Sequence, residues 1–113
     1  MPVRGTGVGG LGRYSDPAIL ILTSLTSGPK HGYGLMKDIE AFAETAIAPG
    51  TLYGALDRLA DQGLIECLPA EQRRHPYRIT DAGAQELRAY YASLSLVSSA
   101  LGVRLGTLGT LGT

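Results

Sequence analysis

Apolar side chains recur at helical spacing in three consecutive segments of the chain. The first segment begins after Ser15 or Asp16, either of which can cap a helix, with Pro17 in the first turn. Gly28 and Pro29 are typical of a helix end. This spacing predicts a first helix with a broad apolar surface, formed by Ile19, Leu20, Leu22 and Leu25.

A second helix is predicted over residues 32–44. Leu35, Ile39 and Phe42 fall on one face of this segment, and Met36 lies beside them. We therefore expect this face to pack in the core, while the charged residues between these positions point to water.

A third helix is predicted over residues 50–62, after a turn at residues 45–49, and Gly63 suits the position just beyond its end. Its expected core stripe with flanking alanines is Leu52, Leu56, Leu59, Ala55 and Ala60. Two helices joined by a short turn, the second with a polar outer face, are typical of a helix-turn-helix.

The pattern then changes to that of a β-hairpin. Residues 64–68 and 77–80 are strand-like, and the polar residues 69–76 form the tip between them. Pro76 cannot donate to a strand ladder, so it should begin its strand or lie on an edge. Thr80 can cap a last helix. The expected fold is mainly α with a small β-hairpin (α+β), a winged helix-turn-helix.

The last helix, from residue 81 onward, carries apolar residues in steps of three, four, three and four, which is a heptad seam. We expect this seam to form a dimer interface. Gly102 and Gly106 are expected to fray the helix end. The predicted interface residues, including the neighbouring Tyr91, are Leu87, Tyr90, Tyr91, Leu94, Val97 and Leu101.

These elements divide the chain into four parts. Residues 1–14 are a glycine-rich tail that we expect to be flexible, and residues 15–80 form the winged helix domain. Residues 81–103 are the dimerisation helix, and residues 104–113 are a low-complexity tail of Leu-Gly-Thr repeats.

Composition excludes several classes of protein. Ten basic and ten acidic residues give no net charge, so a nucleic acid partner would need a local basic patch. The lone Cys67 excludes a disulfide within the chain, and its position in a strand predicts packing rather than reactivity. No apolar run spans a bilayer and no signal peptide is visible, so we expect a soluble, cytoplasmic protein without a membrane partner.

A local basic patch lies at the hairpin tip, where residues 73–78 hold three arginines. Guanidinium groups suit phosphate geometry. A charged turn is often only solvated, but after a helix with a polar outer face it predicts a wing that contacts double-stranded DNA through Arg73 and Arg74.

The third helix is the predicted reading helix. Thr51 and Tyr53 can donate hydroxyl groups to phosphates or base edges, and Gly54 allows the backbone to approach the groove closely. Arg58 can contact a phosphate or a guanine. Asp57 would be repelled by phosphates, so it is expected to pair with a base such as Arg58.

The start of the second helix is a further candidate. Its N–H groups can hold a phosphate, with Tyr33 or Lys37 adding to the contact. The alternative is that Tyr33 packs in the core and His31 merely precedes the helix. The residues leave both interpretations open.

Three segments resemble the PadR family of bacterial transcriptional regulators. They are GPKHGYGLMKDIE at residues 28–40, GTLYGALDRLADQGLI at residues 50–65 and RRHPYRITDAG at residues 73–83. The single last helix is similar to that of the smaller subgroup. The resemblance implies a winged helix-turn-helix with a C-terminal dimerisation helix, which acts as a dimeric repressor at palindromic operators. It also implies that Tyr77 belongs to the wing with Arg73 and Arg74.

Two other functions are possible for such a sequence, an enzyme and a protein-binding module. The acidic pairs Glu40–Glu44 and Asp57–Asp61 lie one helical turn apart, but no third ligand or histidine accompanies either pair. We therefore predict no enzyme, no metal and no cofactor. The second is a winged-helix module that binds only protein, although the wing arginines favour DNA. A small-molecule effector between the last helix and the first could change the separation of the reading helices and release DNA.

Overall fold

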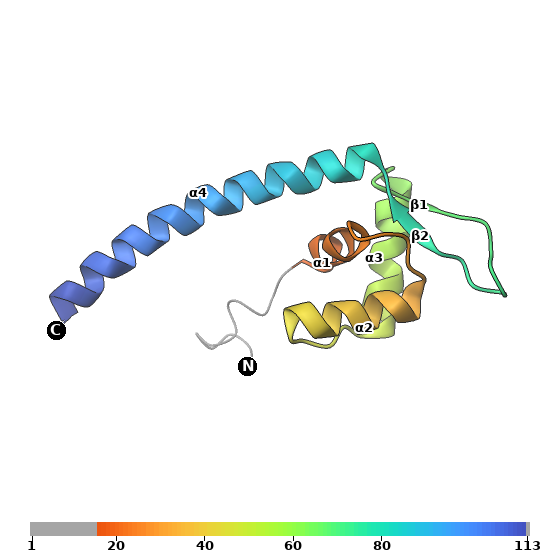
Figure 1. Cartoon of the computed structure of the whole chain (residues 1–113), viewed down its shortest axis with the longest axis horizontal. Coiled ribbons are helices and arrows are strands. Elements are labelled where there is room, and N and C mark those ends of the chain that lie inside the picture. The colour runs from red at the N-terminus through yellow and green to blue at the C-terminus, as the bar shows by residue number, and fades with distance from the viewer. Residues whose placement is uncertain (1–15, 113) are drawn as a thin grey trace.

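Three helices form a small body from which a β-hairpin and a long fourth helix extend (Figure 1). The computed structural model describes residues 16–112, with side chains as far as residue 108. The predicted N-terminal tail and Ser15 lie outside the described residues. The order of elements is α1 (Pro17–Leu25), α2 (Gly32–Ala43), α3 (Pro49–Asp61), β1 (Ile65–Cys67), β2 (Tyr77–Ile79) and α4 (Asp81–Gly112). The predicted fold class, mainly helical with one antiparallel hairpin, is confirmed.

The helix ends follow the capping signals of the sequence. Asp16 Oδ1 accepts a hydrogen bond from the Ala18 N–H at 2.9 Å, and proline opens both α1 and α3. The third helix starts at Pro49, one residue before the predicted start, because a proline at this position gives up no helical hydrogen bond. Gly63, with a φ of 76°, follows its end.

The core lies where α1, α2 and α3 meet. The predicted core positions Leu35, Ile39, Leu52, Leu56 and Leu59 are buried, as is most of α1. Phe42 was predicted to join them but is 44% exposed. It lies in the last turn of α2, where Ala43 and the following Ile47 pack against the core instead.

A polar network fixes the loop between α1 and α2. The buried Ser24 donates its hydroxyl to Asp38 Oδ2 at 2.6 Å. Lys30 donates to the Ser24 carbonyl and to Ser27 Oγ, and its Nζ lies 3.9 Å from Asp38 Oδ2. Because this network holds the residues just before α2, it also fixes where α2 begins.

The hairpin pairs Ile65 with Ile79 and Cys67 with Tyr77. Between them, Arg78 forms a cross-strand ion pair with Glu66, whereas none of the ion pairs found among the described residues involves Arg73 or Arg74. Cys67 was predicted to pack but is exposed, because β1 ends here and the chain continues into the wing.

A single-residue β-bridge joins Lys30 to this hairpin. Lys30 exchanges two backbone hydrogen bonds with Tyr77, at 3.1 and 2.8 Å. Pro76 precedes β2, as predicted, and its carbonyl accepts from the Leu68 N–H at 2.7 Å. The start of α2 is therefore tied directly to the base of the wing.

The fourth helix begins where the hairpin ends. Thr80 Oγ1 accepts from the Gly83 N–H at 3.1 Å and donates to the Gly63 carbonyl at 2.7 Å, which confirms the predicted cap. The predicted fraying at Gly102 and Gly106 is wrong, since the helix is continuous to Gly112. An isolated glycine costs a helix only about 1 kcal/mol and removes no backbone hydrogen bond.

Within the described part of the chain, no helix is both long and apolar enough to cross a membrane. The same residues hold no cluster of three or more histidine, cysteine or acidic side chains that could bind a metal ion.

Candidate nucleic-acid interface

The outer face of α3 exposes most of the predicted reading residues. Thr51, Tyr53 and Arg58 are exposed, and Gly54 is half-buried. Arg58 folds back along the helix, with Nη1 3.7 Å from the position that a Cβ on Gly54 would occupy. The predicted pairing of Asp57 with Arg58 is wrong for the described residues, where no ion pair joins the two.

Tyr53 is directed toward the start of α2. A Cβ added to Gly32 would lie 2.0 Å from the Tyr53 hydroxyl oxygen, so only glycine leaves room for this ring. The hydroxyl therefore lies against the first residue of α2 rather than projecting straight out from α3.

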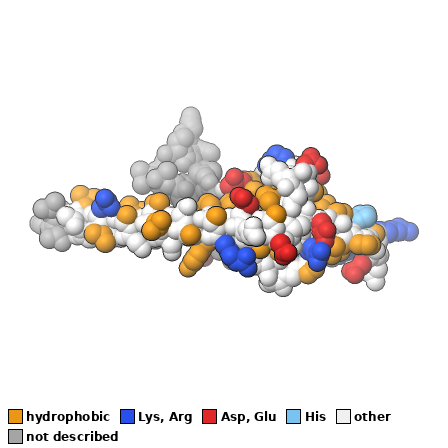
Figure 2. Space-filling model, turned by 90° about the horizontal axis from the view of Figure 1, so that it is seen from above, with side chains coloured by type: hydrophobic (Ala, Val, Ile, Leu, Met, Phe, Trp, Pro, Cys, Tyr) orange, Lys and Arg blue, Asp and Glu red, His pale blue; other side chains and the backbone are white. Residues whose placement is uncertain are grey.

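The wing ends in a tight two-residue turn. Glu71 and Arg74 exchange two backbone hydrogen bonds, at 2.6 and 2.9 Å, around Gln72 and Arg73. These two residues have φ values of 52° and 71°. Two positive φ angles define the type I′ turn, whose twist matches that of a hairpin. The turn exposes both Arg73 and Arg74, and Figure 2 shows basic side chains at the end of the molecule opposite the tip of α4.

A cleft of about 450 Å³ lies between the wing and the start of α2. Within residues 16–112 no carboxylate lines it, so the charged side chains of these residues that face the cleft are basic. The structure brings five of the predicted DNA-binding residues together here and leaves Lys37, Thr51, Gly54 and Arg58 outside. The lining residues are His31, Gly32, Tyr33, Tyr53, Arg73, Arg74, His75 and Tyr77.

Tyr33 is 62% exposed, so the alternative that it packs in the core is excluded. Lys37 Nζ lies 5.8 Å from the centre of its ring, within the range of a cation–π contact, and 3.8 Å from Glu40 Oε1. Both Tyr33 and Lys37 thus lie on the outer surface of α2, where their polar ends are accessible.

Tyr77 is a half-buried residue of the cleft lining. Burial raises the pKa of its phenol above the usual value of 10.0, and the neighbouring Cys67 and Asp57 act in the same direction. The hydroxyl therefore stays protonated at neutral pH and remains a hydrogen-bond donor.

Three residues that line the cleft were not predicted as DNA contacts, namely His31, Gly32 and His75, and His31 has the most unusual surroundings. It is the N-cap residue of α2, but its side chain makes no capping hydrogen bond. Its Nδ1 is buried without a partner, while its Nε2 lies 3.4 Å from Arg74 Nη1. The N-cap position was readable from the sequence, but its proximity to a wing residue 43 positions away was not.

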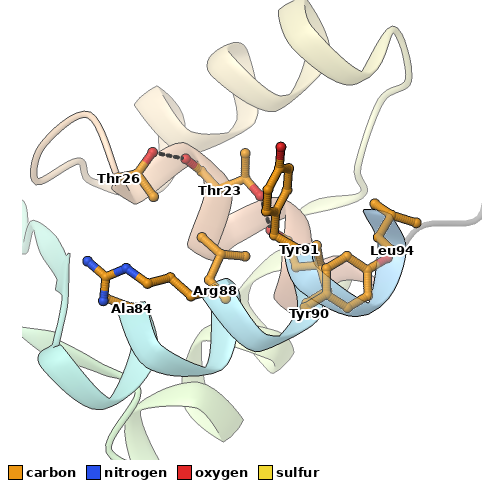
Figure 3. A pocket seen from close by; sticks show the side chains of 9 residues that line it. Thr23, Thr26, Ala84, Arg88, Tyr90, Tyr91 and Leu94 are labelled. Carbon is orange, nitrogen blue, oxygen red and sulfur yellow. Dashed lines mark hydrogen bonds between the residues drawn. The ribbon is translucent and has the colours of Figure 1, made fainter. Parts of the chain in front are cut away.

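A second hollow, of about 510 Å³, separates α1 from the first turns of α4 (Figure 3). Thr23 of α1 and Thr26, which follows the end of α1, line it and are linked by a 2.7 Å hydrogen bond from the Thr26 hydroxyl to the Thr23 carbonyl. Arg88, Tyr90 and Tyr91 line it from α4, along with Leu94.

The predicted seam of α4 is mostly uncovered. Leu87 packs against the core, but the remaining members are between 41% and 69% exposed. Hydrophobic side chains follow one another along α4 in Figure 2. Exposed apolar rows of this length mark interaction surfaces in proteins.

The sequence model described as the transcriptional regulator PadR-like family matches residues 21–89. The transcriptional activator GvpE2 of Halobacterium salinarum is 30% identical over 102 residues, which are 90% of this chain and 52% of GvpE2. The curated relatives it matches are longer, since the chain spans 25% to 52% of their length.

Solved structures agree with this assignment. A PadR-like transcriptional regulator from Bacillus cereus is 28% identical with a TM-score of 0.69, over 78% of this chain and 89% of that protein. A PadR family regulator from Clostridium difficile, 23% identical, shares the fold with a TM-score of 0.73, over 80% and 99% of the two chains. Because the family match covers more than half of the chain and these structures share its fold, the chain belongs to the PadR-like family of transcriptional regulators.

Proposed function

We propose that this chain is a sequence-specific regulator that binds double-stranded DNA as a homodimer and represses transcription at a palindromic operator. The observation that carries the proposal is that Tyr53 of α3, the start of α2 and the wing arginines meet at one cleft, with Thr51 and Arg58 exposed beside it on α3. A protein with no net charge has no general attraction to DNA, so this local concentration of basic groups supports a specific contact.

In the proposed complex, α3 enters the major groove and α2 braces it from behind. Thr51, Tyr53 and Arg58 face the DNA from α3. Arg73 and Arg74 contact the phosphates beside the groove, because a guanidinium group can bind a phosphate through two hydrogen bonds. Tyr33 and Lys37 add contacts from α2, and Tyr77 supports the wing.

The exposed seam of α4 supports the proposed homodimer. Its uncovered seam would pair two copies and set two reading helices about 34 Å apart, one turn of DNA. A protein-binding winged helix would also need a seam, but it would not need an arginine turn beside the reading helix. Repression is the proposed outcome, although GvpE2 is named an activator. Lower expression of a reporter gene behind the operator when the protein is present would support repression, and higher expression would contradict it.

An effector would act in the hollow between α1 and α4, whose volume is in the usual range for small-ligand sites. The hollow adjoins the seam through Tyr90 and Leu94, so an occupant would change the separation of the reading helices. Thr23→Trp, which fills the hollow in place of an occupant, should itself weaken operator binding and abolish any further release by a ligand. Release that persists in this variant would contradict the assignment.

The DNA proposal is tested by measuring the affinity for an operator duplex after changing Arg73 and Arg74 to alanine together. We expect affinity to fall about tenfold or more, and the slope of log affinity against log salt to become shallower by about 2, because two phosphate contacts are lost.

The matched control changes Arg88 and Arg104 on α4 to alanine, which alters the net charge equally and leaves the wing intact. This control should keep both the affinity and the salt slope. Equal losses in the two double variants would mean that net charge rather than the wing governs binding. A wild-type protein without specific affinity for its own promoter region would show that the chain is a protein-binding module instead.

Gly54 gives a separate test of the reading face. A Cβ at this position meets only Arg58 Nη1, at an ordinary contact distance of 3.7 Å. Gly54→Ala should therefore raise the free energy of unfolding by about 0.5–1 kcal/mol, the usual gain in a helix interior. Operator affinity should fall, because the methyl group separates α3 from the groove. If urea denaturation shows Gly54→Ala to be more stable and its operator affinity is nevertheless unchanged, DNA lies away from this face.

A further inference from the structure

We infer that His31 is a phosphate-binding residue, and that its ring holds one phosphate of the DNA backbone together with Arg74. The inference rests on the proposed DNA-binding function and deepens it. It starts from a hydrogen-bonding conflict around the ring, which neither neutral form of the histidine resolves within the described part of the protein.

A neutral imidazole carries one N–H donor and one acceptor nitrogen, and a guanidinium group only donates. Arg74 Nη1 lies 3.4 Å from His31 Nε2, so this neighbour requires Nε2 to be the acceptor. The proton then belongs to Nδ1. Nδ1, however, is buried and has no acceptor within reach.

The surroundings of Nδ1 favour the other tautomer, in which Nδ1 carries no proton. His31 is the N-cap residue, and a Cβ on Gly34 would lie 3.9 Å from Nδ1, so this nitrogen faces the first turn of α2. The first turn of a helix presents free N–H donors and a partial positive charge. An unprotonated Nδ1 suits this place, but Nε2 would then carry a proton that points at the donors of Arg74.

An anion in the cleft removes the conflict. With Nδ1 unprotonated beside the helix start, the Nε2–H and the Arg74 guanidinium can both donate to the same phosphate group. The cleft has room for it, at about 450 Å³, and the residues that the structure places around the cleft include no carboxylate that would compete. The Tyr53 hydroxyl, at the first residue of α2, lies on the same side and can complete the set of donors.

The test compares two substitutions, His31→Asp and His31→Asn, whose introduced side chains are nearly isosteric with each other and differ in charge. Both are good N-caps, so each should raise the Tm of the free protein, by about 4 °C or more. Asparagine can still donate to a phosphate, whereas aspartate adds a negative charge that repels it. We expect His31→Asn to keep operator affinity within a few-fold of the wild type and His31→Asp to lower it about tenfold or more.

If His31 had a purely structural role, any change in operator affinity would follow the change in Tm, and it would be the same in both variants. Equal operator affinities for His31→Asp and His31→Asn, with the wild type binding normally, would overturn the inference while leaving the proposed function intact. If the wild type binds no duplex, both the inference and the proposed function fail.

Nitrogen NMR of the histidine rings is an independent test, because His31 should be protonated on Nε2 in the DNA-bound state. A ring protonated only on Nδ1 in the complex would overturn the inference.

Inorganic phosphate distinguishes a free anion from the DNA backbone as the source. If millimolar phosphate raises the Tm of the wild type but the two His31 variants bind the operator equally well, the site belongs to a free anion and the DNA assignment is wrong. If phosphate competes with the operator for the wild type, and does so less for His31→Asp, the assignment to the backbone is supported.

Discussion

Leu94→Asp is expected to convert the protein to a monomer at micromolar concentration and to lower operator affinity by a factor of about 100 or more. Leu94 is 49% exposed and lies in the middle of the α4 seam, so the carboxylate disturbs little in the isolated chain. In a dimer the same carboxylate would be buried against apolar side chains without a partner. Analytical ultracentrifugation and operator titration measure the two effects.

Leu96→Asp provides the matched control. Leu96 is 74% exposed and lies two residues further along α4, about 200° around the helix and therefore on the opposite face. The same change in charge at this position should leave the dimer and the operator affinity intact. Monomers in both variants would mean that α4 is buried on all sides in the assembly. A dimer that survives Leu94→Asp would place the interface elsewhere.

The reason for the large effect on DNA is geometric. A single winged helix contacts one half of a palindromic operator, and the second half-site binds as an intramolecular event once the first is held. Loss of the dimer removes this advantage without altering any residue of the cleft. Affinity for a single half-site should therefore be equal in the wild type and Leu94→Asp.

The order of elements was predictable because local signals carry it. Asp16 with Pro17, Gly63 and Thr80 each act on the adjacent turn of the chain, and the structure uses all of them. The leucine spacing of α3 was equally sufficient, since a helix with one apolar stripe has one way to face the core. The burial of Phe42 and Cys67 was predicted wrongly, because it depends on whether another helix or strand extends far enough to cover the side chain. Phe42 lies beyond the core contact of α2, and Cys67 lies where the hairpin leaves the body.

The candidate site was predictable by residue but not by arrangement. The sequence indicates that Arg73, Arg74 and Tyr53 are polar or basic and close to predicted turns and helices. It does not indicate that Tyr53 points back to Gly32, nor that Arg78 is paired with Glu66. His31 entered the site only through contacts with a residue distant in sequence, which no local pattern encodes. The need for glycine at position 83 was not predictable either, because it depends on contacts with Leu64 and Ile79, which are distant in sequence.

Gly83→Ala is expected to lower the free energy of unfolding by about 2–3 kcal/mol, the upper part of the range for overpacking. A Cβ here would lie 2.1 Å from the Leu64 carbonyl oxygen and 2.9 Å from Ile79 Cγ1. The carbonyl cannot move aside easily, because it also accepts the Thr80 N–H at 3.1 Å. The start of α4 would have to shift away from the hairpin, and urea denaturation followed by circular dichroism measures the cost.

Gly102→Ala on the same helix separates this clash from helix propensity. Nothing lies within 4 Å of a Cβ at Gly102, so alanine there should raise the free energy of unfolding by about 0.5–1 kcal/mol. Both variants must be compared at one protein concentration, because the proposed dimer would contribute to stability. Opposite signs at the two positions would establish that Gly83 is required for close packing, whereas a gain at both would show that α4 can tilt freely. Since the tilt of α4 sets the separation of the reading helices in the proposed dimer, Gly83→Ala should also weaken operator binding even where the protein remains folded.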